Sequence, residues 1–219
     1  MDEISSAYKP HIPEGIVVFI SGVPGVGKTT ISYELLSRYE EFRIIQETDL
    51  IREILRGYNE YLEKISNNSD IVREICEKNP IPDHMKIFNY MELKNQCLIM
   101  RQSIEKIVER QQRKGIPSII NGVHIVPEVL NGIVQNKKVL FINLYIKTKE
   151  ALSLRLRGRD EHKYKPFLDI SFETNCSLYN NTQKLAQEFP LVFKNIDVTH
   201  LTVNQVVCSA IKFIKLKRG

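Results

Sequence analysis

Short apolar segments alternate with amphipathic segments along most of the chain. The apolar segments are rich in β-branched and aromatic residues, which is typical of strands that are buried on both faces. They lie at 16–20, 42–45, 116–120, 139–146 and 192–198. The segments between them carry apolar residues at helical spacing and predict helices at 30–36, 50–56, 84–114, 149–157, 171–189 and 203–216. This alternation predicts a three-layer α/β/α fold, in which helices cover both faces of a mainly parallel, five-stranded sheet.

A glycine-rich loop follows the first predicted strand and precedes a predicted helix. It fits the phosphate-binding pattern G-x-x-x-x-G-K-[ST], so the predicted fold is that of a P-loop NTPase. Its glycines allow backbone N–H groups to point at phosphate oxygens, and the following helix adds the positive end of its dipole. We expect Lys28 to reach the β- and γ-phosphates and the Thr29 hydroxyl to hold Mg²⁺. The predicted nucleotide-binding residues are Gly22, Val23, Pro24, Gly25, Val26, Gly27, Lys28, Thr29 and Thr30.

The composition limits what else the protein can be. The chain has 219 residues, of which 42% are hydrophobic, and this predicts a single domain over 1–219. Its net charge of +5 suits a protein that handles phosphorylated molecules, but it is small for a dedicated nucleic-acid binder. The four cysteines form no C-x-x-C pair, the first residues do not resemble a signal peptide, and no apolar run reaches the length of a membrane span. We therefore expect a cytoplasmic protein with free thiols that binds neither nucleic acid nor membrane. The composition is compatible with either a monomer or a homodimer.

Several loops should meet at one edge of the predicted sheet. Right-handed crossovers place the loops that follow parallel strands at the carboxyl edge, where α/β proteins bind their ligands. Besides the glycine-rich loop, this edge would receive Asp49, the segment 121–124 and the arginines after the fourth strand. The region 58–114, irregular up to 83 and helical from 84, is the expected substrate-covering insertion.

Asp49 is the predicted catalytic base. It follows the second strand at the start of a helix, so its carboxylate could orient an acceptor and take its proton during phosphoryl transfer. The alternative is an N-cap, which Thr48 or Asp49 could provide, and Glu47 is the second candidate for the base. Arg52 lies one helical turn further on. It either grips an anionic acceptor, is a solvated helix residue, or forms a salt bridge with the neighbours of Glu53.

Three residues after the third strand are candidates for binding the acceptor. Asn121 can hydrogen-bond a hydroxyl or a water on Mg²⁺, but it cannot act as a base. Gly122 and His124 follow it at the predicted carboxyl edge of the sheet. His124 could instead be a packed polar residue without contact to a ligand.

The arginines after the fourth strand predict a mobile lid over 155–168. Arg155, Arg157 and Arg159 are spaced by two residues, with Gly158 as the expected hinge. Such a lid can neutralise the charge that spreads over the γ-phosphoryl group in the transition state. We expect Arg159 to be the catalytic arginine and Arg155 to bind the nucleotide, whereas the alternative is a basic helix end that interacts with the helix dipole.

Two large classes of P-loop protein do not fit the sequence. A GTPase switch requires Asp-x-x-Gly and Asn-Lys-x-Asp, but the first is absent and the nearest match to the second, Asn-Lys-Lys-Val at 136–139, lacks the acid. A motor ATPase usually ends a strand with an acid, whereas the corresponding strand here ends at Asn121. A small P-loop kinase remains, in which the loop hydroxyl holds Mg²⁺ and an arginine segment closes over the phosphates.

Three segments, SGVPGVGKTT at 21–30, TDLIR at 48–52 and GVHIVP at 122–127, lie at the ends of predicted strands. Together they resemble the 2-phosphoglycerate kinase-like family and, more broadly, the zeta-toxin and adenylate-kinase-like group. Members of that family tend to carry Glu immediately before Gly-Val-His, where this chain has Asn121.

The resemblance implies an ATP-dependent phosphotransferase that moves the γ-phosphoryl group to a small anionic metabolite, such as a phosphoglycerate-like acid. It implies ATP and Mg²⁺ as cofactors and a small-molecule phosphate acceptor as partner. One alternative is a kinase for a nucleotide, sugar or nucleotide-sugar, as in the zeta-toxin group. The other is a non-catalytic ATP-binding regulator, which gains support from Asn121.

Overall fold

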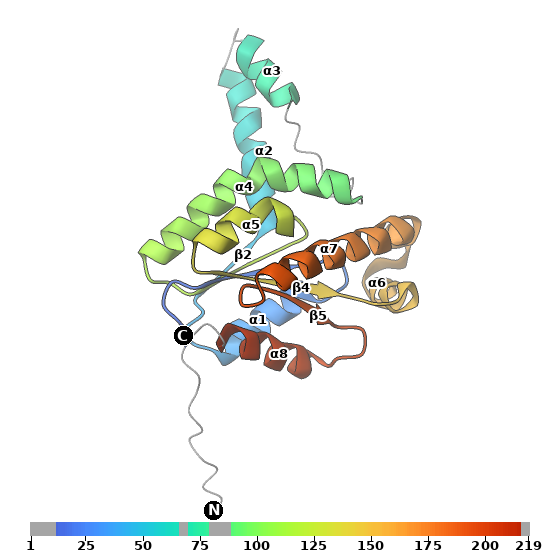
Figure 1. Ribbon diagram of the computed structural model, residues 1–219. Coiled ribbons are helices and arrows are strands. Elements are labelled where there is room, and N and C mark those ends of the chain that lie inside the picture. The colour runs from blue at the N-terminus through green and yellow to red at the C-terminus, as the bar shows by residue number, and fades with distance from the viewer. Residues whose placement is uncertain (1–11, 66–69, 79–88, 216–219) are drawn as a thin grey trace, which may run out of the picture.

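A five-stranded sheet forms the centre of the computed structural model, which describes residues 12–65, 70–78 and 89–215 (Figure 1). Inside these ranges, the side chains at 75–76, 78 and 159–164 are left undescribed. All strands are parallel and their order is β2-β3-β1-β4-β5. The strands are β1 (Val17–Ser21), β2 (Ile44–Glu47), β3 (Ser118–Asn121), β4 (Val139–Tyr145) and β5 (Phe193–Asp197).

Helices lie on both sides of this sheet, which confirms the predicted three-layer fold. On one side are α1 (Lys28–Arg38) and α8 (Val203–Lys215) (Figure 1). On the other side are α4 (Tyr90–Arg113), α5 (Pro127–Asn136) and α7 (Leu168–Glu188). Two further elements, α6 (Lys149–Tyr164) and the 3₁₀ helix η2 (Lys165–Phe167), connect β4 to α7.

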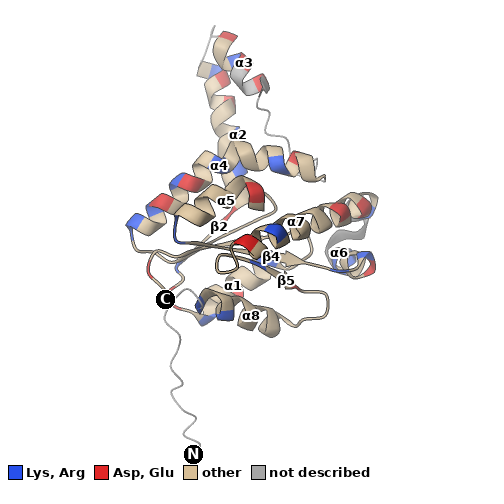
Figure 2. Cartoon of the chain, in the orientation of Figure 1, with Lys and Arg blue, Asp and Glu red and all other residues tan. Residues whose placement is uncertain are grey.

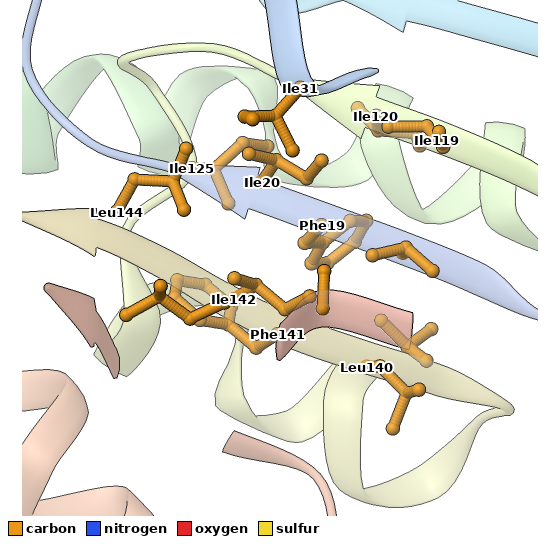
Figure 3. Packing of buried hydrophobic residues seen from close by; sticks show 14 of the residues in the cluster. Phe19, Ile20, Ile31, Ile119, Ile120, Ile125, Leu140, Phe141, Ile142 and Leu144 are labelled. Atoms are coloured by element: carbon orange, nitrogen blue, oxygen red, sulfur yellow. The ribbon is translucent and has the colours of Figure 1, made fainter. Parts of the chain in front are cut away.

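The two central strands carry the densest part of the core. All five residues of β1 are buried, as are the first six of β4, because helices cover both faces of the sheet. Phe19 of β1 and Phe141 of β4 meet edge to face, with their ring centroids 6.4 Å apart (Figure 3). In the sheet register, Ile20 lies beside Asn121 and Ser21 lies beside Asn143. The loops after β1 and β3 therefore start side by side at the carboxyl edge.

The second helix, α2 (Thr48–Ile65), is longer than the sequence predicted. The predicted end before Gly57 was wrong, and so was the irregular structure expected from residue 58, since α2 runs through the glycine and α3 (Asp70–Lys78) follows. A glycine inside a helix costs only about 1 kcal/mol relative to alanine, which is too little to end a helix whose apolar spacing continues. That spacing continues at Ile54, Tyr58, Tyr61 and Ile65. As a result, α2 and α3 stand out from the layered body (Figure 1).

The segment predicted as a mobile lid, 155–168, is helical. The expected helix end near 157 was wrong, because α6 continues through Gly158 to Tyr164 and η2 follows directly. Nothing lies within 4 Å of the position that a Cβ on Gly158 would take, so this glycine is a tolerated surface position in a continuous helix.

The fourth helix begins later in the described chain than the predicted start at 84. Asn89 caps α4 by accepting a hydrogen bond from the backbone N–H of Glu92 at 2.9 Å, while 84–88 lie outside the described residues. Among the helices that the structure describes, none combines the length and the apolar character needed to cross a membrane.

Candidate functional site

The loop between β1 and α1 has a geometry suited to binding phosphate. Gly22, Gly25 and Gly27 all have positive φ, at 140°, 88° and 95°. Gly27 is the N-cap of α1, and no atom lies within 4 Å of the place that its Cβ would take. The positive φ of Gly27 and the open space beside it leave the N-terminus of α1 accessible to an anion.

Lys28 and Thr29 are the first two residues of α1. The Lys28 ammonium donates a hydrogen bond to the backbone carbonyl of Val23 at 2.9 Å, so it lies over the loop. Thr29 is exposed, and the first turn of α1 contains no acidic residue. An ammonium, a hydroxyl and free helix N–H groups fit the phosphates of ATP and a Mg²⁺ ion, whose preferred ligands are oxygens.

Asp49 and His124 come together although they are far apart in the sequence. Nδ1 of His124 lies 3.6 Å from Oδ1 of Asp49 and 3.1 Å from the hydroxyl of Thr48. Thr48 and His124 are fully buried, whereas the Asp49 side chain is 58% exposed. Because α2 begins at Thr48, Asp49 lies in the first helical turn. A buried imidazole thus lies beside the Asp49 carboxylate, which remains open to solvent.

Gly122 permits the close approach of β3 and α2 that forms this cluster. A Cβ built on Gly122 would lie 1.7 Å from Oγ1 and 2.8 Å from Cβ of Thr48. Its φ of 155° adds strain for any other residue. The glycine of the Gly-Val-His motif is therefore required by the packing of Thr48.

Replacement of Gly122 with alanine should destabilise the protein, by about 1–3 kcal/mol or more, because the new methyl overlaps a fully buried side chain. Thermal unfolding measures the effect as a fall in Tm. Gly132→Ala is a suitable control, since its nearest neighbour would be a flexible arginine end 3.6 Å away. An unchanged Tm in the Gly122 variant would contradict the close packing of Thr48.

Arg52 is a buried guanidinium one turn after Asp49. Its side chain is only 2% exposed, and its Nη2 donates to Glu53 at 2.5 Å. Within the described chain, its Nε and Nη1 are buried and have no hydrogen-bond partner. The bond from Arg52 lowers the pKa of the Glu53 carboxyl below its usual value. The alternative of a solvated helix arginine is therefore wrong, whereas Arg52 does form a salt bridge, with Glu53 itself.

Asn121 forms a hydrogen bond to helix α1, away from the cluster of Thr48, Asp49 and His124. Its Nδ2 donates to the hydroxyl of Ser32 at 2.9 Å, and that hydroxyl donates to the carbonyl of Lys28 at 2.9 Å. Both side chains are buried. Ser32 was not among the predicted site residues, although its position four residues after Lys28 on the same helix face was an available signal.

The lid arginines do not gather at one point in the described chain. Arg155 donates to the backbone carbonyl of Val198, directly after β5, and Arg157 is exposed. The side chain of Arg159 lies outside the described residues. Leu156 does reach the loop, since a Cβ on Gly25 would lie 3.0 Å from its Cδ2. The helix α6 is therefore beside the phosphate loop.

A hydrogen bond joins the start of α4 to the first turn of α5, which follows shortly after His124. The Tyr90 hydroxyl donates to Glu128 and accepts from Asn181 of α7 at 2.8 Å. Burial raises the pKa of Tyr90, and burial also raises the pKa of the Cys97 thiol to about 12. Charged residues of both signs are spread along the outer side of α4 (Figure 2). These contacts place the middle of the 58–114 region over the loop that carries His124.

Comparison with known proteins agrees with this geometry. A family model described as an AAA domain matches residues 18–180. The chain belongs to this AAA domain family. Among solved structures, a shikimate kinase from Acinetobacter baumannii in complex with shikimate has a similar fold, with a TM-score of 0.52 over 95% of this chain and 96% of that one, at 13% identity.

The AAA domain protein also has relatives that are named 2-phosphoglycerate kinase. One from Pyrococcus horikoshii is 29% identical over 69% of this chain and 48% of its own length. Another from Methanopyrus kandleri is 28% identical over 89% of this chain and 60% of its own length. The resemblance to that group is confirmed, and the chain spans about half the length of these relatives.

Proposed function

We propose that this AAA domain protein is an ATP-dependent kinase that transfers the γ-phosphoryl group to a small anionic acceptor. A phosphoglycerate-like acid is the first candidate. The names of the relatives and the phosphate-binding geometry of the loop support phosphoryl transfer. The burial of Arg52 is the observation that supports a negatively charged acceptor.

A buried guanidinium with unpaired donors is stabilised by an anion that accepts its hydrogen bonds. Each buried donor left without a partner costs about 1–3 kcal/mol, and more when the group is charged. Arg52 has two such nitrogens within the described chain, and Glu53, the acid to which its Nη2 donates, is 49% exposed. A carboxylate or phosphate can accept two parallel hydrogen bonds from an arginine, which would satisfy these donors and fix the orientation of the acceptor.

The residues at the carboxyl edge divide the proposed chemistry between them. Lys28 and the loop N–H groups would hold the β- and γ-phosphates, while the Thr29 hydroxyl would hold Mg²⁺, which supplies positive charge to the transferring group. Asp49 would accept the proton of the acceptor oxygen as that oxygen bonds to the γ-phosphorus. The bond from the γ-phosphorus to its bridging oxygen breaks, and ADP leaves.

Buried neighbours would position the proposed base. Thr48 and His124 are buried beside Asp49, and Thr48 packs closely against Gly122. In this proposal they keep the carboxylate aimed at the acceptor, so their role is to position it.

The helical elements around the site have proposed roles as well. The 58–114 region would cover the acceptor, and the 155–168 segment would close over the phosphates with Arg159 at the γ-phosphoryl group. Since Arg155 binds the carbonyl of Val198, it would reach the nucleotide only at the side where β5 ends.

An acceptor screen tests the proposed reaction. Release of ADP is measured with ATP, Mg²⁺ and one acceptor at a time, chosen from phosphoglycerates, other hydroxy acids, neutral sugars, nucleosides and nucleotide-sugars. We expect turnover with a hydroxy acid. Preference for a neutral sugar or nucleoside would overturn the anionic acceptor. Tightly bound ATP that stays intact with every acceptor would favour the non-catalytic regulator. Asn121 supports that alternative, because an amide stands where a carboxylate could have acted beside the loop.

Replacement of Arg52 with methionine should raise the KM for the acceptor by about 10- to 100-fold, the usual loss for one or two hydrogen bonds to a charged group. The KM for ATP should change little. The Tm should stay constant or rise, because an apolar side chain replaces a buried charge that is incompletely paired.

Arg56→Met is the matched control for Arg52. Arg56 lies one turn further along α2, pairs with the same Glu53 at 3.1 Å, and is 34% exposed. We expect normal kinetics from this variant. If the two variants changed the KM for the acceptor equally, Arg52 would act only as a partner of Glu53, as Arg56 does. The main support for an anionic acceptor would then be lost.

A further inference from the structure

Helix α2 carries an exposed apolar stripe that its own fold does not explain. The stripe, which we call the α2 stripe, consists of Leu50, Ile54, Tyr58, Tyr61 and Ile65. Each of these side chains is 54–62% exposed. The spacing of four, four, three and four residues is close to the seam spacing of a coiled coil. A continuous apolar surface of this kind usually marks an interaction site.

The α2 stripe adjoins the face by which α2 contacts the body but does not coincide with it. Ile51 is 7% exposed and faces the body. It lies between Leu50, which is 62% exposed, and Arg52, which is 2% exposed. At the foot of the stripe, a groove of about 430 Å³ opens between α2 and α4, and Ile54 lines it together with Leu55 and Ile107. Since α2 and α3 stand out from the layers (Figure 1), the outer face is open to a partner of helical shape.

We infer that the partner is a second copy of this chain, packed with its α2 antiparallel to the first. An isologous contact requires a surface that complements itself under a two-fold rotation. The midpoint of the α2 stripe falls between Gly57 and Tyr58. A two-fold axis there sets Leu50 against Ile65 of the second copy and Ile54 against its Tyr61.

The glycine at this midpoint suits a close approach of two helices. Nothing lies within 4 Å of the place that a Cβ on Gly57 would take, so a second helix can come near the backbone there. The rings of Tyr58 and Tyr61 lie together, with centroids 6.4 Å apart, and offer a broad apolar contact on either side of the axis.

Charges along one flank of the stripe complement each other in the antiparallel pair. Glu53, Gly57, Glu60 and Lys64 follow one another at spacings of four, three and four, on the same side of the stripe. In an antiparallel pair this flank meets its own reversed copy, so Lys64 of one chain approaches Glu53 of the other at both ends. A parallel pair would instead set this flank against the opposite flank of the second helix, so Lys64 of one chain would not meet Glu53 of the other.

The oligomeric state of the full chain tests this inference, independently of any kinase activity. Sedimentation across a concentration series should give twice the mass of the chain for the wild type. Ile54→Lys should give a monomer, and the control Leu191→Lys should not, because Leu191 is similarly exposed at 58% but lies outside α2. A monomeric wild type would overturn the inference, as would an Ile54 variant that stays dimeric. Circular dichroism establishes that the variants are folded.

Cross-linking tests the orientation of the pair. Two tagged versions of the chain, Leu50→Cys and Ile65→Cys, are mixed and oxidised. We expect a disulfide between the two versions, since their positions face each other in the antiparallel pair. Disulfides that form mainly between two Leu50→Cys chains would indicate a parallel pair and overturn the proposed geometry. Tyr33→Cys, equally exposed at 55% but on α1, should form no such disulfide.

Discussion

Replacing Lys28 with alanine is expected to lower turnover on the order of a hundredfold or more, because a charge-assisted contact to the β- and γ-phosphates is lost. The fold should stay intact. Lys28 lies over the glycine loop on the carbonyl of Val23 and is only half-buried, so its truncation opens no cavity in the core. The measurement is the rate of ADP release with the best acceptor from the screen, together with Tm.

Lys106→Ala is the control for this experiment. Lys106 is 70% exposed on α4 and forms a surface pair with Glu109 at 2.9 Å. Its loss should leave turnover unchanged, since exposed pairs contribute little. If Lys28→Ala turns over at a near-normal rate, the loop after β1 is not the phosphate site and the proposed function fails with it.

The layered fold could be predicted because its strands are buried on both faces. Strands such as β1 and β4 lack polar alternation, and such runs between helical segments are typical of a parallel sheet. The glycine loop was equally clear from its spacing. Together these two signals place the carboxyl edge of the sheet, and with it the cluster of Asp49 and His124.

Helix ends were predicted less well, because local glycine signals compete with packing. Gly57 and Gly158 were both interpreted as a helix end or hinge, yet both lie inside helices. In α2 the apolar spacing continues beyond Gly57, and the cost of one glycine inside a helix is modest. Beyond Gly158 the next six residues are Arg, Asp, Glu, His, Lys and Tyr, so α6 continues there without such a spacing. In α2 the same spacing produces the exposed α2 stripe. The stripe was not predicted, because residues 58–83 were interpreted as irregular.

The partners of individual polar side chains could not be derived from the sequence. Arg52 could have been solvated or buried, and only the packing of α2 against the body decides that it is buried. For Asn121, the sequence predicted a hydrogen bond to an acceptor hydroxyl or to a water on Mg²⁺, and it gave no sign of the bond to Ser32, a residue 89 positions away. Such contacts depend on the rotation of each helix about its axis, which the sequence pattern fixes only roughly.

Replacing Asp49 with asparagine is expected to lower turnover by about two to four orders of magnitude, the usual contribution of a positioned acid–base group. Asparagine keeps the size of the side chain and removes its charge and its capacity to take a proton. The affinity for ATP should change little, because Lys28, Thr29 and the loop N–H groups would carry it. Asp49 lies in the first turn of α2, so loss of its interaction with the helix dipole should cost only about 0.3–1 kcal/mol of stability.

Glu47→Gln is the matched control, since Glu47 is the other carboxylate at the end of β2. We expect near-normal turnover from it. A large loss in the Glu47 variant alone would make Glu47 the base. A shift of the Mg²⁺ dependence in the Asp49 variant, with acceptor affinity unchanged, would make Asp49 a metal-binding residue. Unchanged turnover in both variants would leave Asp49 with a structural role only, because the buried pair of Thr48 and His124 would then hold a carboxylate that takes no proton.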